Sequence, residues 1–300
     1  MLLLNICLLL GPHHRLVRYI WALFYYYFYG SVAFLFFNMN PIGPVVGIAF
    51  FSTLFIVVTY LMVADLFDKK TAIFASVLIA FSAVLIDLSR FSWNPNLLPM
   101  SSFIAVYFFI KSLSQKNRMY PLLTGLFAGI SFQLHYVTFA LLFAFFVVTF
   151  FRKHPLLYIK SFLLALVAFA SINIPLVLFD IRHGFLNAKN FIALFSSPSS
   201  QGDVSLSSIY DGVLALHAFA FSTYDFAPLV MLIPFVGLIW TLKVIKNTTY
   251  KSLLTIFFLT LVPTSIMTAQ KISSLFWHFV STLLCCSCCC NSKTYRTGKS

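Results

Sequence analysis

The chain has 300 residues, of which 61% are hydrophobic and 9% are charged, and its mean hydropathy is +0.95. So little polar surface excludes a water-soluble globule and indicates a multispanning membrane protein. The formal net charge of +13 does not indicate a nucleic-acid partner, because the lysines and arginines form no basic tract and no single basic face.

The N-terminal segment allows two interpretations. Met1–Leu10 is apolar but has about half the length of a span, and it lacks the small residues of a signal-peptide cleavage site. Residues 23–37 are apolar and rich in tyrosine. They fit a span with Arg15 and Arg18 on the inside, and they fit a helix that lies in the membrane interface with its hydroxyls in water.

Further apolar runs predict membrane-spanning helices, because about 20 apolar residues cross the hydrocarbon as a helix. In chain order they are Gly43–Ala64, Thr71–Leu88, Leu97–Leu113, Pro121–Leu134, Val137–Phe151, Ser161–Phe179, Ala227–Leu242 and Ser252–Ala269. The fold class that follows is all-α, a polytopic transmembrane helical bundle of about eight to ten spans.

Basic residues lie in alternate connections between these runs, at 69–70, 111–118, 152–160 and 243–251. By the positive-inside rule these connections are cytoplasmic. The other connections face outward and contain three polar segments, at 89–96, 135–136 and 180–226. The predicted transmembrane domain covers residues 23–270, between an atypical N-terminus at 1–22 and an atypical Cys-rich C-terminus at 271–300.

The first outward segment combines an arginine with a turn sequence. Asp87 precedes Arg90 by three residues, which allows an ion pair on a helix surface. Trp93 is typical of the membrane interface, and Pro95 favours a non-helical Asn94 whose side chain bonds nearby backbone. A guanidinium held on such a turn is suited to a phosphate, although snorkelling of Arg90 to lipid headgroups is the simpler alternative.

The other two outward segments add further ionisable groups. His135 and Tyr136 lie between two spans. A histidine at such a position often only has its hydrogen bonds satisfied at the membrane interface and has no further role. Asp180, Arg182 and His183 follow the span that we expect to end at Pro175. They fit an ordinary charged helix end, but three ionisable groups on the same face as Arg90 and His135 favour a site for an anionic ligand.

All seven acidic residues are aspartates. Asp65 and Asp68 lie beside Lys69 and Lys70 on the cytoplasmic side, where we interpret them as a solvated helix end. So few carboxylates limit any acid–base mechanism.

A run of cysteines closes the chain, at Cys285, Cys286, Cys288, Cys289 and Cys290. The run lacks the two separated pairs of a tetrahedral metal site, and we predict no metal and no cofactor. Reversible lipidation of these cysteines and translation out of frame both stay open.

Three motifs in order carry a family resemblance: RFSWNPNLLP at 90–99, GLFAGISFQLHY at 125–136, and DIRHGF at 180–185. They resemble bacterial relatives of the protein O-mannosyltransferases, membrane glycosyltransferases of the GT-C fold, a superfamily that includes the lipid A aminoarabinose transferase. Residues 24–27 and 40–41 extend the resemblance to about residues 23–270.

The resemblance implies transfer of a sugar from a polyprenyl-phosphate-linked donor to a glycan, lipid or protein acceptor on the extracytoplasmic side. The reaction would be a metal-independent, inverting displacement. Arg90, Arg182 and His183 would hold the phosphate, His135 and Tyr136 would orient the donor, and Trp93 and Asn94 would shape the pocket.

The chain departs from the family at its beginning. Relatives carry a first span and a large outer loop whose aspartate is the general base, whereas no acidic residue precedes Asp65 here. We therefore expect a fragment that has lost its opening span, and an inactive form that still binds the donor stays open as an alternative. Asp87 and Asp180 are the remaining candidates for a catalytic carboxylate on the outer side.

A lipid-phosphate transporter or flippase is the competing class, but neither internal repeats nor charged helices at the bilayer midplane are found. A passive membrane fragment is a third interpretation. In every case we expect an integral membrane protein in contact with membrane lipid. For the transferase, the resemblance places it in a bacterial plasma membrane, with its active site facing outward.

Overall fold

The computed structural model describes residue 30 and residues 35–150, 156–189, 252–253 and 255–256. Their elements are all helical, in the order α4 (Ile42–Leu66), α5 (Lys69–Ala80), α6 (Ala83–Leu88), the 3-10 helix η2 (Asn94–Leu97), α7 (Leu98–Ser114), α8 (Met119–Leu134), α9 (Thr138–Phe150) and α10 (Leu156–Arg182). The predicted span at 227–242, most of the one at 252–269, and the termini at 1–22 and 271–300 lie outside the described residues.

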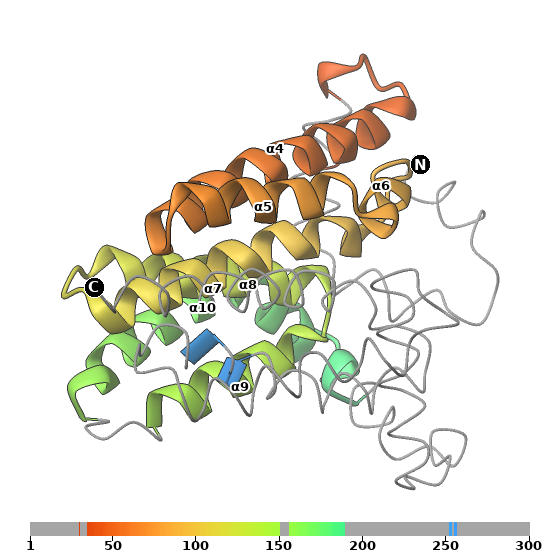
Figure 1. The fold of residues 1–300 in the computed structure, drawn as a ribbon. Coiled ribbons are helices and arrows are strands. Elements are labelled where there is room, and N and C mark those ends of the chain that lie inside the picture. Colours follow the sequence, from red (N-terminus) through yellow and green to blue (C-terminus); the bar gives the residue numbers. More distant parts are fainter. Residues whose placement is uncertain (1–29, 31–34, 151–155, 190–251, 254, 257–300) are drawn as a thin grey trace, which may run out of the picture.

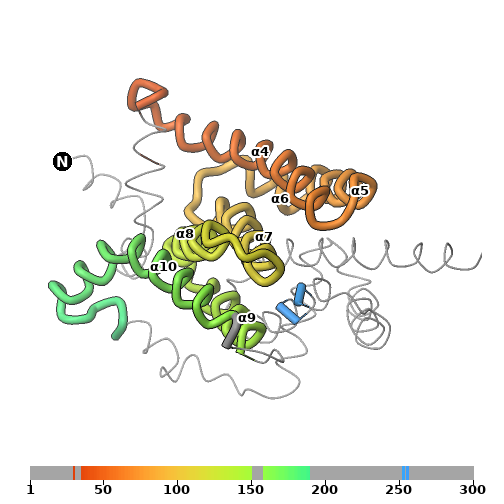
Figure 2. Tube along the Cα trace, turned by 90° about the vertical axis from the view of Figure 1, so that its left-hand side faces the viewer, coloured from red at the N-terminus to blue at the C-terminus, as the bar shows by residue number. Residues whose placement is uncertain are grey.

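The helices form three layers. Figures 1 and 2 show α7 and α8 in the middle, with α4, α5 and α6 on one side and α9 and α10 on the other. The core of this arrangement contains fully buried apolar side chains of the middle layer and α9, among them Phe103, Ile110, Leu134 and Leu141.

The all-α membrane fold predicted from the sequence is confirmed. Among the described residues, three helical stretches are long and apolar enough to cross a membrane: Ile42–Leu66, Asn94–Ser114 and Tyr158–Arg182. The outer layers also expose large apolar side chains, such as Phe50 and Leu61 of α4 and Val167 of α10. Hydrocarbon rather than water suits such surfaces.

The predicted span Thr71–Leu88 is wrong as a single helix, because the chain breaks between α5 and α6. Phe81 leaves the helical conformation with φ −99° and ψ 9°. The Ser82 hydroxyl then accepts a hydrogen bond from the backbone N–H of Leu85 at 3.3 Å and starts α6. Serine favours such N-caps, and an average of hydropathy does not detect them.

The predicted end of a span at Pro175 is also wrong, because α10 continues through this proline to Arg182. One proline removes one backbone donor, and membrane helices tolerate that loss. Asp180 and Arg182 therefore belong to the last turn of α10, and the third outward segment begins at His183.

Two glycines allow α8 and α10 to approach closely. A Cβ on Gly125 would overlap the backbone carbonyl of Ala165, and a Cβ on Gly129 would overlap the side chain of Ile172. Small residues four positions apart are the usual device for such crossings in membranes. This contact fixes the end of α8 relative to the end of α10.

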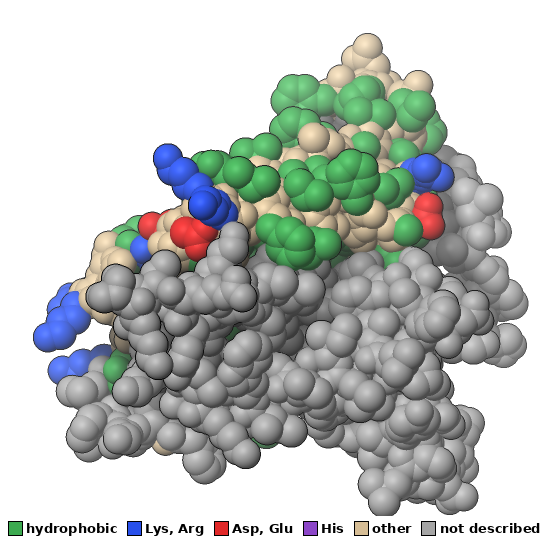
Figure 3. Space-filling view, viewed as in Figure 1, with side chains coloured by type: hydrophobic (Ala, Val, Ile, Leu, Met, Phe, Trp, Pro, Cys, Tyr) green, Lys and Arg blue, Asp and Glu red, His purple; other side chains and the backbone are tan. Residues whose placement is uncertain are grey.

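The back-and-forth course of the helices defines two ends of the bundle. We call the end that contains residues 87–97, 134–138 and 180–188 the site end. The opposite end, with residues 65–70 and 111–119, is the basic end, where Lys69, Lys70, Lys116 and Arg118 gather. In Figure 3 most blue side chains lie at the left, and one lies beside a red one at the right.

Candidate functional site

The first group at the site end is an exposed ion pair at the end of α6. Arg90 NH1 lies 3.7 Å from Asp87 Oδ1, and the two side chains are 72% and 74% exposed. The pair predicted from the spacing is confirmed. At this distance and exposure it contributes little to stability, so both charged groups are available to other partners.

Asn96 closes the segment that carries Arg90. Its side-chain amide donates to the backbone oxygens of Leu88 at 2.7 Å and Phe91 at 2.8 Å. The residue is buried, and its Oδ1 has no hydrogen-bond partner among the described residues. Asn96 was not predicted as a site residue, although a second asparagine after a proline is a signal for such a closed turn.

Asn94 connects this segment to the next one. Its amide donates to the backbone oxygen of Leu134 at 2.6 Å, across 40 residues of sequence. The predicted bond to nearby backbone is therefore wrong, and the extended residue is Trp93 rather than Asn94, which begins η2. The carbonyl of Leu134 is free to accept because α8 ends there.

His135 and Tyr136 form the turn between α8 and α9, and their rings stack at 4.4 Å. The Nδ1 of His135 accepts the backbone N–H of Val137 at 3.1 Å, which leaves the proton on Nε2. Burial lowers the pKa of His135 to about 4 and raises the pKa of the Tyr136 hydroxyl. Both side chains are therefore neutral at pH 7 and can donate a hydrogen bond to an anion.

The last turn of α10 carries the third group. Arg182 is exposed, and His183 stacks on the ring of Phe179 at 3.8 Å with its Nδ1 at 2.8 Å from the Phe179 oxygen. The carboxylate of Asp180 accepts two backbone N–H groups, from Asn187 at 2.6 Å and Ala188 at 3.2 Å.

The structure thus joins two of the three predicted groups directly. The Asn94 bond holds the Arg90 segment against the His135 turn. The turn after α10 carries the third group. Its relation to the other two groups comes from the close crossing of α8 and α10 at Gly125 and Gly129.

A pocket of about 190 Å³ lies beside the Arg90 segment, between α4, α6, η2 and α7. Its polar lining residues are Ser52, Thr53, Ser89 and Asn96, and its apolar ones include Phe51, Leu85 and Met100. Such a lining suits an apolar chain that enters from lipid.

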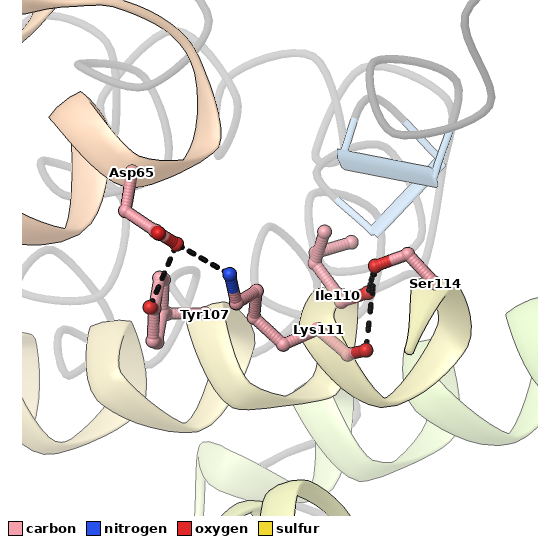
Figure 4. Close-up of polar contacts among 5 residues, drawn as sticks. All are labelled: Asp65, Tyr107, Ile110, Lys111 and Ser114. Atoms are coloured by element: carbon pink, nitrogen blue, oxygen red, sulfur yellow. Dashed lines mark hydrogen bonds and ion pairs between the residues drawn. The ribbon is translucent and has the colours of Figure 1, made fainter. Parts of the chain in front are cut away.

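The basic end holds a different kind of cluster. Lys111 Nζ lies 2.7 Å from Asp65 Oδ2, and the hydroxyl of Tyr107 donates to the same oxygen at 2.9 Å (Figure 4). The lysine also lies over the rings of Tyr107 and Tyr120. Asp65 does lie at an exposed helix end, as interpreted from the sequence, and it is also paired with Lys111 of α7. The adjacent Asp68 caps α5 through the backbone N–H groups of Lys70 and Thr71.

Among the described residues, no group of three His, Cys, Asp or Glu side chains could hold a metal ion. The cysteine run at 285–290 lies outside those residues. The described site end presents charged, hydrogen-bonding and aromatic side chains.

Apolar helices whose ends carry cationic and hydrogen-bonding groups define an integral membrane protein with a polar site at one end of its bundle. The family model for dolichyl-phosphate-mannose-protein mannosyltransferases matches residues 22–177, slightly more than half of the chain, and the chain belongs to this family. It is a membrane glycosyltransferase of the GT-C type.

The matched region contains the Arg90 segment and the His135 turn and ends five residues before Arg182. No curated protein and no solved structure matches the chain.

Proposed function

We propose that this protein transfers a sugar from a polyprenyl-phosphate-linked donor to a glycan, lipid or protein acceptor. One observation carries the proposal: the 2.6 Å bond from Asn94 to Leu134, which holds the Arg90 segment against the His135 turn. It supports placing Arg90 and the neutral hydrogen-bond donors of the His135 turn at the same end of a membrane bundle, where a lipid phosphate lies. Family membership supports the same chemistry.

Arg90 binds the donor phosphate in this proposal. Its long, exposed contact with Asp87 is weak, so a phosphate can replace the carboxylate as the partner of the guanidinium. The pocket beside the segment takes the first part of the polyprenyl chain. Arg182 and His183 add positive charge or hydrogen bonds to the phosphate from the end of α10.

His135 and Tyr136 orient the donor sugar or its phosphate. Since His135 is neutral with its proton on Nε2, it donates a hydrogen bond without the cost of burying a charge. The stacked ring of Tyr136 supports the histidine. Trp93 and Asn94 shape the wall between this turn and Arg90.

Asp87 is the general base of the proposed reaction. When the phosphate takes Arg90, the carboxylate loses its cationic partner and can accept the proton of an acceptor hydroxyl. The hydroxyl oxygen attacks the anomeric carbon as the bond to the phosphate oxygen breaks, and polyprenyl phosphate leaves with its negative charge beside Arg90. A single displacement inverts the anomeric centre and needs no metal.

The site end faces the extracytoplasmic side of the membrane in this proposal. The support is the distribution of Lys69, Lys70, Lys116 and Arg118, which all lie at the opposite end. Short basic connections remain on the cytoplasmic side.

The test is transfer from a synthetic polyprenyl-phosphate sugar by the full chain in detergent or lipid vesicles. Arg90→Ala should weaken donor use by about 1–3 kcal/mol, roughly 5- to 150-fold in kcat/KM, because it removes a charge-assisted contact to phosphate. Arg118→Ala removes an exposed arginine at the basic end and is the matched control.

Equal donor kinetics for the two variants would refute the role of Arg90. A chain that binds polyprenyl phosphate but moves it between leaflets without any sugar transfer would instead support the lipid-phosphate transporter.

A further inference from the structure

The turn that follows α10 is held by the residue that sequence analysis offered as a second catalytic candidate. We propose that Asp180 is a positioning residue, which fixes Arg182 and His183 for the donor phosphate and takes no proton in the reaction. The inference rests on the proposed function for the identity of that ligand.

Both oxygens of the Asp180 carboxylate are engaged within the protein. Oδ1 accepts the backbone N–H of Asn187 at 2.6 Å, and Oδ2 accepts that of Ala188 at 3.2 Å. A general base needs an oxygen that faces the acceptor hydroxyl. A carboxylate bonded to the backbone seven and eight residues later instead closes the loop between them.

The backbone of Asp180 also forms hydrogen bonds that close this loop. Its carbonyl accepts the N–H of Phe185 at 2.7 Å and that of His183 at 3.2 Å. The side chain and the main chain of one residue therefore bond to four positions, 183, 185, 187 and 188. These bonds span the whole turn, from His183 to Ala188.

The turn needs such bonds because its backbone is strained. Gly184 has φ +66° and Phe185 has φ +61°, two left-handed residues in succession. Glycine adopts this conformation freely, whereas phenylalanine does so only where its surroundings impose it. The bonds from Asp180 to Phe185, Asn187 and Ala188 are part of these surroundings, together with the backbone bonds from Gly184 to Ile181 and from Lys189 to Phe185.

The side chains of Arg182 and His183 lie where α10 passes into this turn. Arg182 is the last residue of α10, and His183 is packed on Phe179 by its ring and bonded through Nδ1. If the turn opened, the helix end would fray and both side chains would move away from a common ligand. Asp180 thus acts on the phosphate through Arg182 and His183.

The experiment compares Asp180→Asn with Asp180→Ala in the full chain. Asparagine keeps an oxygen that can accept the N–H of Asn187, but it cannot serve as a base. Two readouts are measured: trypsin cleavage between Arg182 and His183, followed by mass spectrometry in detergent, and the kcat and donor KM of sugar transfer.

We expect Asp180→Ala to increase cleavage after Arg182 and to raise the donor KM by about tenfold, the size of one lost hydrogen bond to a charged group. Asp180→Asn should stay within about threefold of the wild type in KM and keep kcat and its pH profile, since it preserves the stronger of the two bonds. Asp68→Ala removes a carboxylate that caps a helix at the basic end and should change neither readout.

Loss of kcat in Asp180→Asn with the turn still protected from trypsin would overturn the inference and make Asp180 the base. Unchanged cleavage in Asp180→Ala would overturn it as well. If no variant transfers sugar, the proposed function fails, while the cleavage pattern still decides whether Asp180 holds the turn.

Discussion

Each end of the bundle pairs an aspartate with a basic residue, and the two pairs differ in geometry. At the basic end, Lys111 and Asp65 lie 2.7 Å apart, the lysine side chain is 12% exposed, and Tyr107 donates to the same carboxylate. At the site end, Arg90 and Asp87 lie 3.7 Å apart, and each side chain is about three-quarters exposed.

The difference separates a structural ion pair from one that can exchange partners. The shielded pair, Lys111 and Asp65, joins α7 to α4. If a ligand took Lys111 from this pair, the Asp65 carboxylate would be left without its cation. The exposed pair joins two residues of one helix end and holds no elements together. Removing the Asp87 contact should therefore change chemistry at little cost in stability, whereas removing the Lys111 contact should do the opposite.

The largest effect that we expect is on transfer in Asp87→Asn. Loss of a general base lowers kcat by about 10²- to 10⁴-fold, while the unfolding free energy should change by less than about 0.5 kcal/mol at so exposed a position. Donor binding should be retained or tighter, because Arg90 no longer has a competing partner. Transfer kinetics and a vesicle-binding assay with polyprenyl phosphate measure both quantities.

Near-normal kcat in Asp87→Asn would contradict its role as the base. Asp68→Asn provides the control for a change of charge at the basic end, and its kcat should match that of the wild type.

The next largest effect is on the pH dependence of the unfolding free energy. It arises at the site end alone. The pKa of His135 falls from 6.5 to about 4 on folding because the ring is buried. The unfolded chain therefore binds the additional proton between these values, and stability decreases as the pH falls from about 6.5 to 4. The total loss is on the order of 3 kcal/mol.

Chemical denaturation in detergent at a series of pH values measures this slope. His135→Asn should flatten it, since the Asn oxygen can accept the Val137 N–H but does not titrate. A wild-type chain that is equally stable at pH 7 and pH 5 would argue against a buried neutral His135.

Structural features that depend only on residues close together in the sequence could be predicted. The helices at 42–66 and 98–114 follow from apolar runs, and the Asp87–Arg90 pair follows from a spacing of three. The break at Ser82 has a local cause as well. It was missed because serine is a common residue in membrane helices, and only its backbone conformation distinguishes a cap from a helical position.

Contacts between distant segments could not be predicted in the same way. The hydrogen bond from Asn94 to Leu134 spans 40 residues of sequence, and the one from Tyr107 to Asp65 spans 42. The side chains of Asn94 and Asp65 could equally have formed hydrogen bonds with nearby backbone. The crossing of α8 and α10 decides which helix ends meet, and its signal was present in the two glycines at 125 and 129. The two glycines alone do not indicate which helix packs against α8.

The smallest effect separates stability from function at the basic end. Lys111→Met keeps the length and the apolar stem of the side chain and leaves Asp65 without its cation. We expect the unfolding free energy to fall by about 1–2 kcal/mol, less than for a fully buried pair because Asp65 is half exposed. Lys116→Met, at an exposed position in the connection that follows α7, should change it by less than about 0.5 kcal/mol.

The kinetic readout completes this test, because the folded fraction of Lys111→Met should transfer sugar with wild-type kcat and donor KM. Tyr107→Phe removes the second contact to Asp65 and should weaken the chain in the same direction by a smaller amount. If Lys111→Met instead lost transfer while keeping its stability, the basic end would take part in the reaction. The distinction between a structural pair and an exchangeable pair would then be lost.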